Sequence, residues 1–223
     1  DICMLPRPIE PEEQRYQTCC GKVLCSGCIH AAFMVDSRRL CPFCRTPCHT
    51  SDGEGIERLK KRAEGNDAVA IHLLGSSYFG GIRGLPQDVD KGMELWLKAG
   101  ELGYDVAHYN ISQAYDHGEG VERDEKKAKY YYELAAMGGN VSARHNLGYM
   151  EGNTGNINRA LKHFMIAAGA GHDDSLTKIR ECFMNGHATK DDFEKTLRAH
   201  KDAKDEMKSD QRDEAAAAPT GNG

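Results

Sequence analysis

Apolar and polar residues alternate with a helical period along much of the chain, and the same pattern recurs between residues 67 and 200. Small residues stand at Ala70, Ala107 and Ala143, with Ser175 in the same place of the last copy. Eight residues after each come Tyr78, Tyr115, Glu151 and Phe183. A period of roughly 36 residues that contains two amphipathic segments predicts a solenoid of helix pairs, because one pair cannot bury its apolar stripe alone.

The second helix of each pair has its own start and stop signals. Residues that can cap a helix N-terminus stand at Asp88, Asp124, Asn156 and Thr189. Eight residues after each cap there is a large apolar residue: Trp96, Tyr132, Phe164 and Leu197. Small residues that would let helices approach closely follow at Ala99, Ala135 and Ala167, and glycines that end a helix follow at Gly103, Gly139 and Gly171. We therefore expect the first three aromatic residues to occupy one core register.

The loop sequences resemble those of the Sel-1-like repeat, a member of the tetratricopeptide-like superfamily. The motifs are Leu74-Gly75-x-x-Tyr78, Tyr115-x-x-Gly118-x-Gly120-Val121-x-x-Asp124 and Lys127-Ala128. The resemblance covers about 67–200, as three good copies and a degraded fourth. It implies a mostly α fold, an α-solenoid whose surface binds a protein substrate or partner.

The cysteines follow a different pattern, since eight of the nine lie within the first 48 residues and only Cys182 lies in the repeats. Cys25-Ser-Gly-Cys28 and Cys41-Pro-Phe-Cys44 are two Cys-x-x-Cys pairs. This spacing lets two thiolates reach one metal ion from a tight turn, so it favours zinc over a disulfide framework. A segment this short also has too few large apolar residues to fold without such support.

The order of these cysteines resembles a RING-type zinc finger over about residues 1–47, which implies two structural zinc ions. By that resemblance one zinc is held by Cys3, Cys25 and Cys28 with a cysteine expected before residue 1. The other is held by Cys41 and Cys44 with Cys19 or Cys20, or with both. The family usually has histidine where this chain has Lys22, and a protonated lysine cannot bind zinc. The alternative donors for the remaining position are His30, Cys48 and His49.

The same resemblance implies contacts with a ubiquitin-conjugating enzyme. Ile2, Pro42 and Phe33 match positions that touch that enzyme, and Arg45 matches the basic residue that contacts both enzyme and ubiquitin during transfer. Simple packing of the zinc loops explains Ile2 and Pro42 equally well, Phe33 could be a core residue of the finger, and Arg45 could be a solvated charge. No catalytic side chain is implied. The two function classes are a ubiquitin ligase or ligase subunit and a non-enzymatic interaction scaffold.

The remaining segments are expected to connect or cap these parts. Residues 48–66 are interpreted as a linker and leading helix, in which the basic run of residues 56–63 is a solvated face. The last helix is expected from Thr189 to about Arg212, so that 201–223 holds its end and a disordered tail starting at Ala215. The repeat histidines are expected at surfaces or caps.

The composition and charge argue against some classes of function. A net charge of −5 and a pI near 6.1 argue against non-specific nucleic-acid binding, which needs a basic surface. The sequence contains no apolar run long enough to span a membrane. We expect an intracellular protein, cytoplasmic or nuclear. Because the chain does not begin with Met, we interpret it as a fragment that could have lost a targeting signal.

Overall fold

The computed structural model describes residues 8, 14–35 and 39–217, and it is mostly helical. The cysteine-rich segment forms a two-stranded antiparallel sheet, in which β1 (Gln14–Gln17) pairs with β2 (Lys22–Cys25), followed by α1 (Ser26–Val35). The next helices are α2 (Asp52–Glu64), α3 (Ala68–Gly80), α4 (Val89–Glu101), α5 (Asp105–His117) and α6 (Glu125–Met137). They continue as α7 (Val141–Asn153), α8 (Ile157–Gly169), α9 (Asp173–Met184), α10 (Lys190–Met207) and α11 (Asp210–Ala217).

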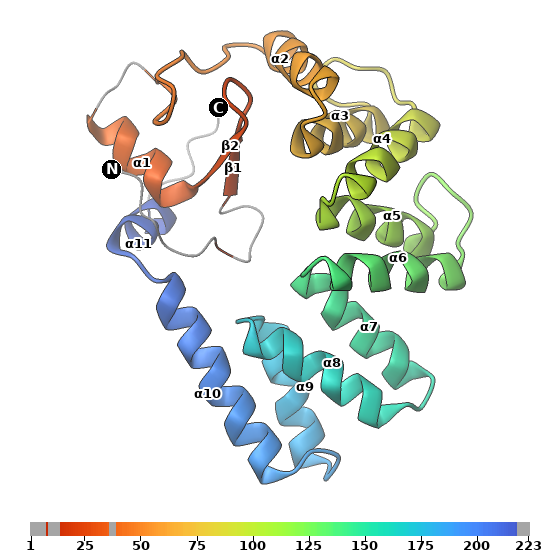
Figure 1. The fold of residues 1–223 in the computed structure, drawn as a ribbon. Coiled ribbons are helices and arrows are strands. Elements are labelled where there is room, and N and C mark those ends of the chain that lie inside the picture. Colours follow the sequence, from red (N-terminus) through yellow and green to blue (C-terminus); the bar gives the residue numbers. More distant parts are fainter. Residues whose placement is uncertain (1–7, 9–13, 36–38, 218–223) are drawn as a thin grey trace.

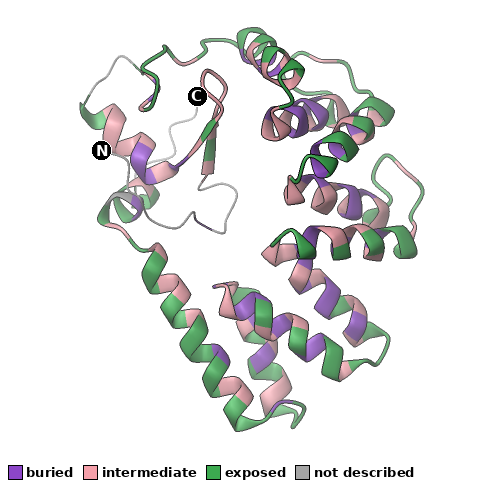
Figure 2. Ribbon diagram, viewed as in Figure 1, coloured by how far each residue is buried: buried purple, intermediate pink, exposed green. Residues whose placement is uncertain are grey.

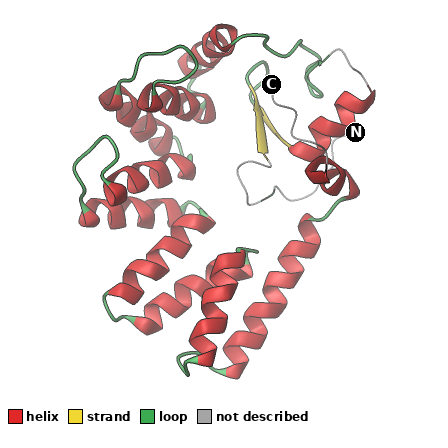
Figure 3. Ribbon diagram, turned by 180° about the vertical axis from the view of Figure 1, so that it is seen from behind, coloured by secondary structure: helices red, strands yellow, loops and turns green. Residues whose placement is uncertain are grey.

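The helices from α3 to α10 stack as antiparallel pairs along an arc (Figure 1). The same arc is seen from behind in Figure 3, with the small sheet and α1 across its opening. The helix α10 runs back towards the cysteine-rich segment, where α11 packs against α1. This arrangement confirms the mostly α fold class and the solenoid.

Burial follows the predicted register in the first three pairs. Buried positions line the contacts between successive helices, while the outer faces are exposed (Figure 2). Trp96, Tyr132 and Phe164 have exposed fractions of 5%, 0% and 5%. The small residues three positions further along, at Ala99, Ala135 and Ala167, are buried as well. The apolar stripe of each pair therefore packs against its neighbours, as a solenoid requires.

Two glycines explain how the large rings fit between paired helices. A Cβ atom at Gly75 would lie 2.9 Å from the Trp96 ring, and one at Gly148 would lie 2.7 Å from the Phe164 ring. Real Cβ atoms essentially never approach so closely. The Leu-Gly step in the first helix of these pairs therefore makes room for the aromatic residue of the second.

The cap signals are mostly as predicted. Asp88, Asp124 and Thr189 accept backbone N–H groups at the starts of α4, α6 and α10, and Thr189 forms a capping box with Asp192. Asn156 differs, because its side chain makes no cap and instead donates to Glu151 Oε2 at 3.0 Å. Left-handed glycines at 103, 139 and 171 follow the second helices, with φ of 87°, 99° and 97°.

The last pair departs from the register. Leu197 is 41% exposed, whereas its neighbour Thr196 is 3% exposed and donates to the Asp192 carbonyl at 2.7 Å. The final helix also ends earlier than expected, at Met207, and residues up to Ala217 form the separate helix α11. The expectation of a disordered tail from Ala215 was therefore wrong for 215–217.

The leading helix begins at Asp52, inside the segment expected to be linker, and it caps the first repeat as predicted. Ile56 and Leu59 pack with Ala70 and Leu74 of α3. Two repeat histidines also differ from expectation, because His72 and His145 are buried rather than at a surface or cap.

Candidate metal centre

Two backbone loops present the cysteines of the candidate site. The first is the turn between β1 and β2, in which Cys20 N and Gly21 N both donate to the Gln17 carbonyl. Gly21 has a φ of 73°, a left-handed conformation that glycine adopts without strain. The second is the loop from Cys41, closed by Arg45 N donating to Cys41 O and by Cys41 N donating to Thr46 O, each at 2.9 Å. Sharp turns in both loops aim the thiols towards one point.

Four thiols meet there: Cys19, Cys20, Cys41 and Cys44, here called the cysteine cluster. Their sulfur atoms all lie within 4.8 Å of one another. The Cys20–Cys41 pair is 3.8 Å apart and the Cys19–Cys44 pair is 3.4 Å apart. Four sulfurs at the Zn–S distance of about 2.3 Å in a tetrahedron lie about 3.8 Å from one another. The cluster therefore has the donor atoms and the spacing that a tetrahedral zinc ion needs.

The protein environment affects the two ends of the cluster differently. Burial raises the pKa of the Cys19 thiol, and its hydrogen bonds to Cys44 and Cys41 add to the increase. The Thr46 hydroxyl, 3.3 Å from Cys44 Sγ, lowers the pKa of the exposed Cys44 thiol to about 6. Since a divalent cation favours the ionised form of every thiol that binds it, metal binding would release protons from this cluster.

The other predicted zinc ligands are placed only in part. Cys25 and Cys28 are buried and their sulfurs are 3.4 Å apart, with Cys28 N donating to Cys25 Sγ at 3.4 Å. Cys3, expected to join them, lies outside the described residues, as does Ile2. The pair has the geometry of one Cys-x-x-Cys knuckle, and its complete ligand set stays a prediction.

The alternative donors lie elsewhere. Lys22 places its ammonium 5.3 Å from the centre of the Phe43 ring. Among the residues that the structure describes, the one group of three or more metal-binding side chains is the cysteine cluster, which does not include His30, Cys48 or His49. The adjacent pair Cys19–Cys20 thus supplies two of the four thiols of the cluster.

Of the residues expected to meet a conjugating enzyme, Pro42 and Arg45 directly follow Cys41 and Cys44 in the sequence, and Phe33 lies in α1. Arg45 is exposed in a left-handed conformation with a φ of 59°, and Pro42 and Phe33 are half-buried. Sequence reasoning missed Phe43 at 51% exposure and Met34 at 76% exposure. The signal for Phe43 was available, because a large apolar residue stands inside the Cys41-x-x-Cys44 turn of a segment that is too short to build a large core around it.

The repeats carry polar side chains that form hydrogen bonds with neighbouring residues. Asn110 Nδ2 lies 2.8 Å from His72 Nε2, and Gln113 Nε2 donates to Tyr109 Oη at 2.6 Å. Asn146 donates to the Tyr132 hydroxyl at 3.0 Å. These bonds stabilise contacts within and between neighbouring repeats.

Comparison with known families identifies the helical part. The Sel1 repeat model matches residues 68–104, 105–140 and 141–172, which are the pairs α3–α4, α5–α6 and α7–α8. The matched residues do not include the cysteine-rich segment. Among the described helices, none combines the length and apolar character needed to cross a bilayer.

Two curated proteins are similar to parts of this chain. The ERAD-associated E3 ubiquitin-protein ligase component HRD3B from Arabidopsis thaliana is 33% identical over 45% of this chain and 16% of its own length. Cytochrome c oxidase assembly factor 7A from Xenopus laevis is 33% identical over 31% of this chain and 30% of its own length. The chain thus spans less than a third of the curated relatives it matches.

A solved structure supports the fold assignment. The Sel1 repeat protein from Oxalobacter formigenes superposes with a TM-score of 0.58 at 23% identity, over 71% of this chain and 66% of that protein. This likeness establishes the fold alone. Together with the matched repeats and the buried register, it shows that residues 68–172 form three Sel1 repeats of a helical solenoid.

Proposed function

We propose that this protein is a zinc-binding RING-type ubiquitin ligase, or a subunit of one, whose Sel1 repeats hold the substrate or partner. The cysteine cluster carries this proposal, because its four thiols come from two loops in the ligand order of a RING finger. Cys3, Cys25 and Cys28 contribute to a second zinc site in the same proposal. Metal-binding thiolates persist in a reducing compartment, so the proposal includes an intracellular location in the cytoplasm or nucleus.

The proposed zinc has a structural role. Four protein ligands close the site to water, so the metal would fix the two loops and would not activate a nucleophile. The fixed loops would present Pro42, Phe33 and Ile2 to a conjugating enzyme. Arg45 would donate to carbonyl groups of the enzyme and of ubiquitin, since its planar guanidinium can serve two acceptors at once.

A non-enzymatic scaffold is the second candidate function. It is favoured by Lys22, which stands at the family's histidine position, and by the matched repeats, which by themselves provide a partner-binding surface. In this alternative the zinc finger only shapes the N-terminal end of the scaffold. The similarity to an assembly factor is compatible with this alternative as well.

The experiment measures zinc and ubiquitin transfer on the same preparations. We expect the purified chain to contain zinc and the Cys44→Ser variant to lose about one equivalent. With a panel of conjugating enzymes, we expect autoubiquitination by the wild-type chain. The Arg45→Ala variant should keep its zinc and lose most of this activity.

The control is Arg180→Ala, which removes an exposed arginine of α9, far from the cluster in the sequence. It should behave as the wild type in both assays. Absence of zinc from the wild-type chain would overturn the metal site. Zinc without ubiquitin transfer by any enzyme of the panel would reject the ligase and favour the scaffold.

A further inference from the structure

The helix α2 contacts both loops of the cysteine cluster. Its basic run was expected to be solvated, but two arginines one turn apart, Arg58 and Arg62, point towards the cysteine-rich segment. Residues four apart lie on the same face of a helix, so both can reach a common neighbour. Their side chains are 22% and 27% exposed, values that are low for surface arginines.

Arg62 holds the first loop. Its Nε donates to the Thr18 carbonyl at 2.9 Å, and its Nη2 donates to the Cys19 carbonyl at 2.9 Å. Both acceptors belong to the turn that carries Cys19 and Cys20. The two bonds use the fixed fork of the guanidinium, so they set the orientation of this turn as well as its position.

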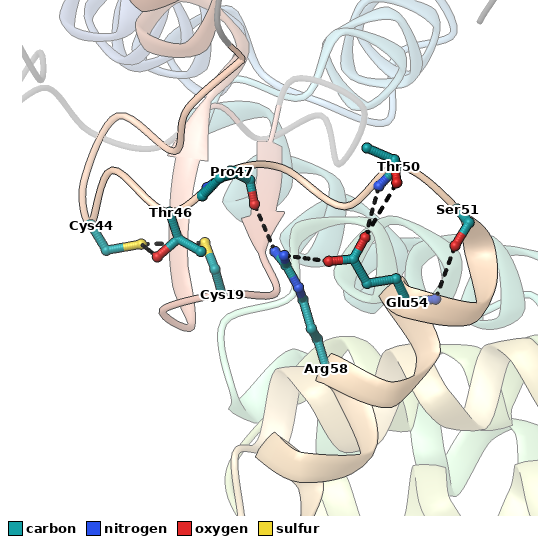
Figure 4. Close-up of polar contacts among 8 residues, drawn as sticks. All are labelled: Cys19, Cys44, Thr46, Pro47, Thr50, Ser51, Glu54 and Arg58. Carbon is teal, nitrogen blue, oxygen red and sulfur yellow. Dashed lines mark hydrogen bonds and ion pairs between the residues drawn. The ribbon is translucent and has the colours of Figure 1, made fainter.

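Arg58 holds the second loop. Its Nη1 donates to the Pro47 carbonyl at 2.9 Å, while Glu54 pairs with its Nη2 at 2.6 Å (Figure 4). Pro47 forms an isolated antiparallel β-bridge with Leu40, which directly precedes Cys41. The loop that carries Cys41 and Cys44 is therefore fixed at its base by Arg58.

The side chains between α2 and the first loop are closely packed. Asp67, the N-cap of α3, lies 3.5 Å from Arg62 Nη1 and accepts a hydrogen bond from the Tyr16 hydroxyl at 2.7 Å. A Cβ atom at Gly21 would lie 2.6 Å from Arg62 Nη1 and 2.8 Å from Asp67 Oδ2. The glycine of the Cys-Cys-Gly-Lys turn is thus needed for α2 to pack against this loop.

We propose that Arg58 and Arg62 are positioning residues for metal binding at the cysteine cluster, each fixing one of its two ligand loops. The inference rests on the proposed zinc site. It follows that zinc binding and the packing of α2 on the first repeat stabilise each other, because α2 contacts both the two ligand loops and α3. The finger and the first repeat then form one thermodynamic unit.

The test measures metal affinity directly on the full chain. Cobalt is titrated in place of zinc, the thiolate-to-cobalt absorption reports tetrahedral sulfur ligation, and zinc competition gives relative affinities. The cobalt absorption that is lost in the Cys44→Ser variant identifies the metal ion bound by the cysteine cluster. We expect Arg62→Ala and Arg58→Ala each to lower the affinity for that metal ion by about 10–100-fold. Removal of a residue that orients metal ligands typically has an effect of this size.

Two further variants separate positioning from charge. Arg62→Lys keeps the charge but can reach only one carbonyl well, so we expect a loss smaller than that of Arg62→Ala. Lys61→Ala removes an exposed charge from the same helix and should leave the affinity unchanged. Arginine variants that bind metal as tightly as Lys61→Ala would overturn the inference.

The wild-type chain provides a second measurement that does not depend on a variant folding. Chelation should speed amide hydrogen exchange in α2 and α3 and leave α7 and α8 unchanged. Unchanged exchange in α2 after complete metal removal would also overturn the inference. If the wild-type chain binds no metal through Cys44, the proposed zinc site itself fails, which is a separate result.

Discussion

A buried carboxylate replaces an aromatic ring in the third repeat. Glu151 stands where the other units have Tyr78, Tyr115 and Phe183, and it is 1% exposed. Lys129 donates to its carboxylate at 2.7 Å, and Arg159 lies 3.5 Å away. The hydrogen bond from Lys129 is the main cause that holds the pKa of this carboxyl below its usual range. Asn156 also donates to Glu151 through Nδ2, and its side chain makes no cap hydrogen bond at the start of α8.

The aromatic register makes a prediction for Tyr132. Its side chain is fully buried and its hydroxyl donates to Asp116 at 3.1 Å. Tyr132→Ala should lower the free energy of unfolding by about 3–5 kcal/mol, through lost burial and the cavity left behind. Urea unfolding followed by circular dichroism measures this change.

Two variants calibrate that result. Tyr131→Ala removes a half-buried ring stacked on Tyr115 and should cost less than half as much. Leu197→Ala removes an exposed side chain and should change stability by roughly 0.5 kcal/mol or less. Equal damage from the two tyrosine variants would show that the register is wrong.

At the scale of elements, α7 and α9 are joined by a buried polar contact. His145 Nδ1 lies 2.7 Å from the Ser175 hydroxyl, and the His172 ring, which caps α9, is 4.6 Å from the His145 ring. Burial is the main cause that lowers the pKa of His145 to about 4. The nearby His172 and Lys178 contribute to this decrease, and Asp174 opposes it. The interface therefore requires the neutral form of this histidine.

This contact makes stability depend on pH. The unfolded chain binds a proton to His145 near pH 6.5, whereas the folded chain does so only near pH 4. The contribution of His145 is therefore present above pH 6.5 and is lost as the pH falls towards 4. Between pH 7.5 and pH 5 we expect a loss of about 2 kcal/mol.

Urea unfolding at the two pH values, with wild type and His145→Gln compared, measures the effect. The variant should lose less stability on acidification than the wild type. Burial also lowers the pKa of His72 to about 4, but His72 contributes equally to the pH dependence of both proteins. His117→Gln, at the exposed end of α5, is the control and should follow the wild type. The same pH dependence in His145→Gln and wild type would contradict this assignment.

At the scale of the whole molecule, the two ends of the described chain meet. Asp173 pairs with His200 at 2.9 Å and with Lys204 at 2.8 Å, which fixes the direction of α10 along α9. The helix then delivers α11 to α1 (Figure 1). The array is therefore closed through the cysteine-rich segment rather than left open at its C-terminal end.

A truncation tests this closure. A chain ending at Met207 lacks α11, so α1 should exchange its amide hydrogens faster and small-angle scattering should show a larger radius of gyration. The helical signal of the repeats should persist, because each repeat depends mainly on its neighbours. A chain ending at Ala217 keeps α11 and should match the full chain. Unchanged protection of α1 in the shorter chain would show that the contact does not persist in solution.

The sequence alone determined the features that depend on local order. Helix pairs, most caps and the core positions Trp96, Tyr132 and Phe164 follow from residue spacing, because a helix places residues at fixed angles around its axis. The grouping of cysteines into short-spaced pairs is equally local, and this spacing is sufficient to indicate a metal site.

Only the tertiary structure decided what distant segments do to one another. Arg58 and Arg62 have the pattern of a solvated basic face, and their partners in the cysteine-rich segment are backbone carbonyls, which leave no trace in side-chain identity. The packing of α11 on α1 and the burial of Glu151 likewise depend on which helix comes to lie opposite. Spacing fixes the faces of each helix, but the partner of each face is set by the complete arrangement of the chain.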